Sequence, residues 1–233
     1  ALVNITSDKC YKNQEDIQIY TEEDTLGGYD PYSNSKACAE LVTDAYRNSY
    51  FNANNYKEHG CSIATVRAGN VIGGGDWAKD RLIPDILRSF EKKEPVIIRN
   101  PEAIRPWQHV LEPLSGYACL AEKLFVFGPE YAESWNFGPK RNDMKSVKWI
   151  VEKLIKKYGE NASWQLDANE NKPHETSILM LDSSKSKLRL QWKPIWDLDT
   201  SIGKIVDWQK RWINKEDILS HTLQEIDQYI HQT

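Results

Sequence analysis

Residues 1–11 read ALVNITSDKCY, a short apolar run that ends abruptly in polar side chains. Residues 2–6 have the length and the composition of a buried β-strand. Ser7, Asp8 and Lys9 follow at once, so a hydroxyl, a carboxylate and an ammonium stand together at the end of that strand. Such groups are costly to bury. Their position therefore predicts a reactive site at the tip of the strand.

A Tyr-x-x-x-Lys motif, Tyr32 to Lys36, begins about 25 residues after Ser7. Its four-residue spacing places a phenol and an ammonium on one face of a helix. A nearby cation favours the phenolate, so the spacing predicts that the Tyr32 pKa falls from about 10 and that its oxygen acts as a base. Taken alone, the motif more often marks two exposed neighbours on a helix than a catalytic pair. The reactive strand tip that precedes it favours the catalytic interpretation.

Strands and helices alternate along the chain. Strands are expected at 2–6, 62–67, 96–98 and 134–137, near 164 and at 178–180, and helices at 31–50, 84–90, 114–125, 145–158 and beyond 200. In the helix at 31–50, Asp30 and Pro31 are suited to the start, and the apolar face is expected to comprise Ala37, Leu41 and Ala45, with Cys38 and Val42 beside them. This alternation predicts an α/β fold with parallel strands.

Composition excludes several classes of partner. The 233 residues, 40% hydrophobic and 27% charged, are ordinary for one large or two small globular domains. The net charge of −4, without a basic block, argues against a nucleic-acid partner. No apolar stretch reaches the roughly 18 residues of a membrane span. The four cysteines lack metal or disulfide spacing, which predicts reduced thiols, a cytoplasmic location and no metal site.

Five stretches together carry a family resemblance: TSDKCY at 6–11, DPYSNSK at 30–36, RAGNVIGGGDWAKDRLIPD at 67–85, RPWQHVLEPLSGY at 105–117 and WNFGP at 135–139. With these stretches the chain resembles the extended short-chain dehydrogenase/reductase family, and within it the nucleotide-sugar 4,6-dehydratases that act on CDP-glucose. Relatives that act on dTDP-glucose carry Thr-Asp-Glu where this chain has Ser7-Asp8-Lys9. The resemblance implies a Rossmann-like, doubly wound parallel sheet with a smaller C-terminal α/β domain. Residues 1–76 and 107–140 would then belong to the NAD domain, and 77–106 and 141–233 to the substrate domain.

The resemblance also implies a reaction. NAD takes a hydride from C4 of CDP-glucose while Tyr32 removes the O4 proton, Ser7 holds that hydroxyl and Lys36 holds the nicotinamide ribose. Water then leaves across C5–C6, with Lys9 as the base and Asp8 as the acid, and the hydride returns to C6. The product is a 4-keto-6-deoxy sugar. The alternative for Lys9 is a purely structural ion pair with Asp8.

Further site residues follow from the resemblance. Thr6 and Arg67 are expected beside the cofactor. The residues expected to hold the substrate carry amide, guanidinium or imidazole groups that match a diphosphate or a ribose: Asn70, Arg81, Arg105 and His174. For Asn70, a simple strand-to-loop turn is the alternative. The triple glycine at 73–75 is expected to form a turn rather than a phosphate cradle, because no strand–glycine–helix context surrounds it.

No G-x-G-x-x-G or G-x-x-G-x-x-G motif occurs in the 233 residues. In this family that glycine turn binds the pyrophosphate in the first strand–helix unit. We therefore expect roughly the first half of the Rossmann domain to be absent, and this chain by itself to be inactive and to bind NAD weakly. An epimerase of the same fold and a non-catalytic fragment remain as alternatives, and the former has no use for Asp8 and Lys9. The family resemblance further implies a homo-oligomer that pairs through long helices, with 31–50 as a candidate.

Overall fold

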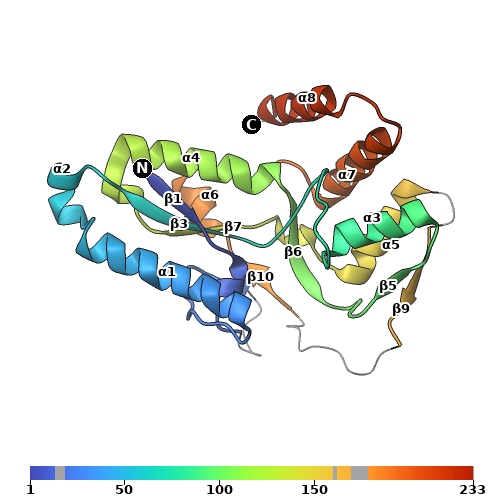
Figure 1. Ribbon diagram of the computed structural model, residues 1–233. Helices are drawn as coiled ribbons and strands as arrows, with labels where there is room; N and C mark the ends of the chain where they lie inside the picture. Colours follow the sequence, from blue (N-terminus) through green and yellow to red (C-terminus); the bar gives the residue numbers. More distant parts are fainter. Residues whose placement is uncertain (14–18, 160–161, 169–177, 233) are drawn as a thin grey trace.

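A computed structural model of the chain describes residues 1–13, 19–159, 162–168 and 178–232. Its first layer is a three-stranded parallel sheet in the order β1 (Leu2–Ile5), β3 (Ile63–Ala68) and β7 (Ser134–Phe137). The helices α1 (Pro31–Ser49) and α4 (Leu111–Phe127) lie on opposite sides of this sheet (Figure 1). This is the predicted α/β architecture with parallel strands.

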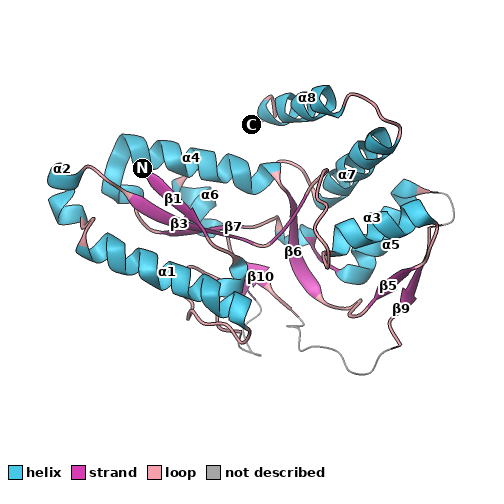
Figure 2. Cartoon of the chain, in the orientation of Figure 1, coloured by secondary structure: helices cyan, strands magenta, loops and turns pink. Residues whose placement is uncertain are grey.

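A second group of elements lies beside the first (Figure 2). Strand β6 (Ile104–His109) pairs in parallel with β4 (Asn70–Ile72) and antiparallel with β8 (Met144–Ser146), while β5 (Val96–Ile98) pairs in parallel with β9 (Trp164–Leu166). The helices α3 (Leu82–Lys92), α5 (Val147–Tyr158) and α7 (Leu198–Ile213) belong to this group. The strand β2 (Ile19–Tyr20) pairs with β10 (Met180–Leu181). The remaining helices of the described residues are α2 (Tyr56–His59), α6 (Ser184–Arg189) and α8 (Ile218–Ile230). The short 3-10 turns of the described residues are η1 (Asp8–Cys10), η2 (Ala53–Asn55), η3 (Gly128–Tyr131) and η4 (Arg141–Asp143).

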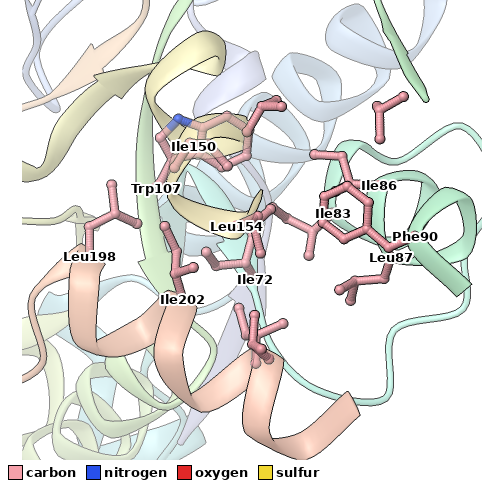
Figure 3. Packing of buried hydrophobic residues seen from close by; sticks show 14 of the residues in the cluster. Ile72, Ile83, Ile86, Leu87, Phe90, Trp107, Ile150, Leu154, Leu198 and Ile202 are labelled. Carbon is pink, nitrogen blue, oxygen red and sulfur yellow. The ribbon is translucent and has the colours of Figure 1, made fainter. Parts of the chain in front are cut away.

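Separate apolar clusters lie in the two groups. The largest joins α3, α5 and α7 to β4 and β6. The members labelled in Figure 3 are Ile72, Ile83, Ile86, Leu87, Phe90, Trp107, Ile150, Leu154, Leu198 and Ile202. A second lies around β3, β7 and α4, and it also includes Leu190 and Trp192 from the C-terminal part of the chain. A third, smaller cluster consists of Cys10, Tyr11, Tyr20, Ala37, Leu179 and Leu181. The proposed domain boundaries stay a prediction.

The expected helices and strands are present with shifts of a few residues, whereas the strands β2, β4, β6 and β8 and the short helices α2 and α6 were not predicted. Strand β6 was missed because its sequence, IRPWQH, contains a proline and three polar residues, a composition that argues against a central strand. Five of its six residues are nevertheless buried. One of their polar groups has a partner that only the tertiary fold supplies: the Gln108 amide donates to the Phe137 carbonyl at 2.7 Å.

The predicted apolar face of α1 is correct at Ala37 and wrong at its other members, among which Ala45 is exposed. The residues that this helix buries are Ser33, Ala37, Glu40 and Thr43. Leu41 and Val42 are instead 57% and 55% exposed, and Cys38 is exposed. The reason is that α1 meets the sheet through polar contacts, for example the Asn4 amide that donates to the Thr43 hydroxyl at 2.7 Å.

A buried carboxylate holds the C-terminal segment against α4. Glu112 has no exposed surface, and it accepts the backbone N–H groups of Ile195 at 2.9 Å and Trp196 at 2.7 Å. It also accepts the Tyr229 hydroxyl of α8 at 2.7 Å. Because a buried polar group without partners is costly, these bonds keep α8 in place.

Two helical glycines give opposite expectations for alanine substitution. A Cβ at Gly116 of α4 would lie 2.3 Å from the Phe137 ring, whereas a Cβ at Gly203 of α7 would meet only the end of the Lys157 side chain at 3.5 Å. We predict that Gly116→Ala lowers the free energy of unfolding by about 1–3 kcal/mol through overpacking. Gly203→Ala should raise it by up to about 1 kcal/mol, since alanine favours the helix. Urea unfolding of both variants measures the difference, and equal effects would contradict this packing of α4 on β7.

Candidate active site

The strand tip forms a tight turn. Ser7 caps η1: its Oγ accepts the Lys9 N–H at 3.2 Å and donates to Asp8 Oδ1 at 3.1 Å. Asp8 is 2% exposed, and its other oxygen, Oδ2, is buried without a hydrogen-bond partner among the described residues. Lys9 is half-buried. The turn therefore shields Asp8 Oδ2 from water and leaves it without a hydrogen-bond partner among the described residues.

The environment of Asp8 favours its protonated form. Burial raises the pKa of this carboxyl above the ordinary value, and the charge of Lys9, the Ser7 hydroxyl and the charge of Arg105 offset this only in part. A carboxyl that keeps its proton nearer neutral pH is suited to donate it to a leaving group. The geometry thus supports the acid role predicted for Asp8, without testing it.

Helix α1 presents the second motif. Asp30 caps the helix, accepting the Ser33 N–H at 3.0 Å and its hydroxyl at 2.5 Å. Gly28 is required just before, because a Cβ there would lie 2.3 Å from the Asn34 nitrogen. From this start, the Lys36 Nζ lies 5.9 Å from the centre of the Tyr32 ring. Tyr32 is 50% exposed, so its ring stands at the surface beside the ammonium.

The two motifs are neighbours in space, because α1 packs against η1. In the described part of the chain, neither the Tyr32 hydroxyl nor the Lys36 ammonium has a hydrogen-bond or ion-pair partner. Both polar groups are therefore free to meet a ligand. Their individual roles, and those of the turn residues, stay predictions.

Thr6 and Arg67, the residues predicted to lie beside a cofactor, bind partners within the protein. Both are buried. The Thr6 hydroxyl donates to Glu40 Oε1 at 2.5 Å, and Arg67 forms an ion pair with Glu40 at 2.8 Å. Arg67 also donates to the Tyr11 hydroxyl at 2.9 Å and to the Glu22 carbonyl at 3.3 Å. A direct contact of either side chain with a cofactor stays a prediction.

The predicted substrate residues lie in different surroundings. Asn70 is half-buried at the start of β4, whereas Arg81 is exposed just before α3. Arg105 is 7% exposed on β6, where its Nη1 donates to the Ile104 carbonyl at 2.9 Å. It is close enough to Asp8 for its charge to lower the pKa of that carboxyl. His174 lies outside the described residues.

Sequence reasoning missed the buried polar network behind the site. Tyr11 donates to Asn136 Oδ1 at 2.7 Å, and the Asn136 N–H donates to the Glu22 carboxylate at 2.7 Å. Glu40 was missed as well. One signal was present in the sequence: Glu40 falls on the same helix face as Ser33 and Ala37, at i+7 and i+3 from them. A carboxylate on an inward face calls for a buried partner.

Within the described ranges, no group of three histidine, cysteine or acidic side chains is arranged to hold a metal ion. The four cysteines are free thiols. The same part of the chain contains no helix with the length and hydropathy needed to cross a membrane.

Comparison with known proteins finds a matching family and relatives that are named as 4,6-dehydratases. The family model described as GDP-mannose 4,6 dehydratase matches residues 1–205. The CDP-glucose 4,6-dehydratase of Salmonella typhimurium is 58% identical over 233 residues, which are all of this chain and 65% of that protein. A dTDP-glucose 4,6-dehydratase of Xanthomonas campestris is 22% identical over 213 residues, covering 88% of this chain and 56% of that protein. The chain thus spans less than two thirds of the length of these relatives.

Solved structures share the fold. A dTDP-glucose 4,6-dehydratase from Bacillus anthracis, in complex with NAD, aligns with a TM-score of 0.71 and 21% identity, over 90% of this chain and 61% of that one. A UDP-glucuronic acid 4-epimerase from Bacillus cereus, in complex with UDP-glucuronic acid and NAD, aligns with a TM-score of 0.73 and 19% identity, over 90% and 61%. These likenesses confirm the Rossmann-like fold class.

The buried Asp8 carboxyl predicts a pH-dependent gain in stability when its charge is removed. The pKa of Asp8 in the folded protein lies above the unfolded value of about 3.9. The contribution of Asp8 to stability is therefore complete below pH ~3.9 and is lost as the pH rises through the folded-state pKa. Asp8→Asn keeps the shape without the charge. We therefore expect the variant to melt at a higher temperature than the wild type at pH 8, with the difference narrowing toward pH ~4.

Glu40→Gln is the control of opposite sign. In the wild type, burial opposes ionisation of the Glu40 carboxylate, but Arg67, Thr6 and Thr65 outweigh burial and lower the pKa of this group. The stabilisation that the Glu40 carboxylate provides is therefore present above about pH 4.3 and is lost in acid. The melting temperature of Glu40→Gln should fall below that of the wild type at pH 8. Thermal melts of both variants between pH 4 and 8 make the comparison, and an Asp8→Asn variant less stable than the wild type at every pH would contradict the prediction.

Proposed function

The chain belongs to the GDP-mannose 4,6 dehydratase family, and we propose that it forms part of an NAD-dependent enzyme that converts CDP-glucose into CDP-4-keto-6-deoxyglucose. The observation that carries the proposal is the 58% identity, along the whole chain, to the Salmonella CDP-glucose 4,6-dehydratase. The strand-tip turn and the Tyr32–Lys36 helix support it, since they supply a hydroxyl, a protonatable carboxyl, two ammonium groups and a phenol side by side.

The side chains at the site fit the proposed cofactor. Tyr32 and Lys36 present uncommitted polar groups from α1, and Lys36 would hold the nicotinamide ribose. When bound, NAD accepts a hydride from C4 of the sugar and returns it to C6. The residues of the chain supply the proton transfers and hold the sugar in place.

The first proton transfer belongs to Tyr32, which takes the proton of the C4 hydroxyl while the Ser7 hydroxyl holds that oxygen. The resulting C4 ketone acidifies the neighbouring C5–H bond. Lys9 removes the C5 proton. Asp8, in its protonated form, donates to the C6 hydroxyl, which leaves as water. The C5=C6 double bond then receives hydride at C6 and a proton at C5 from Lys9.

Asn70, Arg81 and Arg105 are proposed to bind the diphosphate of the substrate. A guanidinium matches phosphate oxygens in a bidentate way. The exposed position of Arg81, at the start of α3, is compatible with a ligand contact. His174 is proposed as a further diphosphate or ribose contact.

A nucleotide-sugar 4-epimerase is the second candidate. The observation in its favour is that structures of 4-epimerases align as well as those of the dehydratases, with TM-scores of 0.73 and 0.71. An epimerase oxidises and reduces C4 and removes no water, so it has no use for an acid–base pair at Asp8 and Lys9. The buried Asp8, whose pKa burial raises, favours the dehydratase.

We also propose a cytoplasmic homo-oligomer. Four free thiols support a reducing compartment. Leu41 and Val42, exposed on the outer face of α1, offer an apolar surface for a second copy of the chain.

The proposed function is tested at the natural length of the protein by incubation with CDP-glucose and detection of a 4-keto product through its absorbance in alkali. We predict that Tyr32→Phe lowers turnover by about 10²–10⁴-fold, the usual contribution of a positioned base, while NAD affinity changes little. Tyr46→Phe, an exposed position on the same helix, is the control and should leave turnover unchanged. A wild-type protein that epimerises or ignores CDP-glucose would refute the proposal.

Variants of Lys9 and Asp8 should separate the removal of the C5 proton from the loss of the C6 hydroxyl. We predict that Lys9→Met still produces reduced nicotinamide on mixing with CDP-glucose but does not exchange the C5 hydrogen with deuterated water. Asp8→Asn should permit that exchange and slow the loss of the C6 hydroxyl, since an amide donates no proton. Mass spectrometry of the recovered sugar nucleotide measures both. Wild-type C5 exchange in Lys9→Met would show that the lysine is not the base.

A further inference from the structure

Glu40 is a buried carboxylate that contacts three strands at once. It lies on α1, which covers one side of the β1–β3–β7 sheet (Figure 1), and its side chain is 2% exposed. Oε1 accepts the Thr6 hydroxyl at 2.5 Å and Arg67 Nε at 2.9 Å. Oε2 accepts the Thr65 hydroxyl at 2.6 Å, Arg67 Nη2 at 2.8 Å and the Ser134 hydroxyl at 3.3 Å. Every one of these partners comes from the sheet or from the end of β1.

Its charge is maintained at neutral pH. Burial opposes ionisation, but the hydrogen bonds and charge of Arg67 and the hydroxyls of Thr6 and Thr65 outweigh it, so the Glu40 pKa lies below its usual value. Arg67 is in turn held by the Tyr11 hydroxyl at 2.9 Å. A buried charge pair with all these partners is rigid, since breaking it would leave an uncompensated charge inside the protein.

The contact with Thr6 links the two motifs of the proposed site. Thr6 is bonded directly to Ser7, the first residue of the strand-tip turn, and Glu40 lies four residues after Lys36 on the same face of α1. We propose that Glu40 is a positioning residue, which holds the Tyr32–Lys36 helix and the Ser7-Asp8-Lys9 turn in a fixed relation through the Thr6 hydroxyl. This inference rests on the proposed function.

The reason for such a link lies in how α1 packs. Its apolar side chains Leu41 and Val42 point outward, so the inner face contacts the sheet through polar groups. Hydrogen bonds are directional, unlike apolar contacts, and they fix the helix along its axis and about it. A displacement of a catalytic group by about 1 Å can lower the rate about 10²-fold. The relative position of the Tyr32–Lys36 helix and the Ser7-Asp8-Lys9 turn therefore controls turnover.

Two isosteric substitutions separate positioning from stability. Thr6→Val and Thr65→Val each remove one hydroxyl that donates to Glu40, but only Thr6 adjoins the catalytic turn. In the protein at its natural length, we expect Thr6→Val to lower kcat on CDP-glucose by about tenfold or more, with KM little changed. Thr65→Val should stay within about twofold of the wild type, and both should lower the melting temperature to a similar extent.

Three further variants complete the test. Thr6→Ser keeps the hydroxyl and should restore most of kcat. Glu40→Gln should lower kcat, and adding Thr6→Val to it should cause little further loss, because the two act through one contact. NAD affinity, measured by calorimetry, should be unchanged in Thr6→Val. A fall in that affinity would mean that Thr6 binds the cofactor directly, and it would overturn the positioning role.

The other outcomes are equally decisive. Equal losses of kcat in Thr6→Val and Thr65→Val, additive losses in the double variant, or a Thr6→Ser variant as slow as Thr6→Val would each refute the positioning role. All of these results require a wild-type enzyme that turns over CDP-glucose. If the wild type does not, it is the proposed function that fails, and the melting temperatures still report the stability of the contacts.

Discussion

The ion pair between Glu40 and Arg67 is the interaction on which the first layer of the molecule depends. It sits between α1 and β3 with both side chains almost fully buried, at 2% and 3% exposure. Such a pair does not by itself make a protein more stable than apolar packing would, because desolvation offsets the attraction. What it supplies is geometry: a helix that meets its sheet through hydroxyls, an amide and a carboxylate has one arrangement in which all of them are satisfied.

The inward polar face of α1 has a consequence for its outer face. In a helix that covers a sheet, the apolar stripe ordinarily faces the core. Here the branched side chains Leu41 and Val42 stand outside. A surface of this kind is compatible with a partner helix, while the inner face keeps the polar groups that hold the helix in register. The same helix can thus carry the proposed site on its first turns and the proposed assembly surface further along.

Two carboxyl groups near the strand tip show how position decides chemistry. Asp8 and Glu40 are equally buried, at 2% exposure. Glu40 has a guanidinium against it and a lowered pKa. Asp8 has one oxygen without a hydrogen-bond partner among the described residues. Its pKa is raised, because the charges of Lys9 and Arg105 only partly offset its burial. One group is therefore suited to hold structure as an anion, and the other to deliver a proton.

The sequence by itself determined the alternation of strands and helices, the parallel sheet, and the pairing of a polar strand tip with a Tyr-x-x-x-Lys helix. These features depend on local periodicity, capping residues and spacing, which are legible along the chain. The tertiary structure alone decided which face of α1 is buried, that IRPWQH is a strand, and that Arg67 pairs with Glu40. Those outcomes depend on polar partners that are distant in sequence: Glu40 lies 34 residues from Thr6, and Gln108 lies 29 from Phe137. No local pattern records such partners, because the cost of burying a polar group is settled only where the chain folds back to meet it.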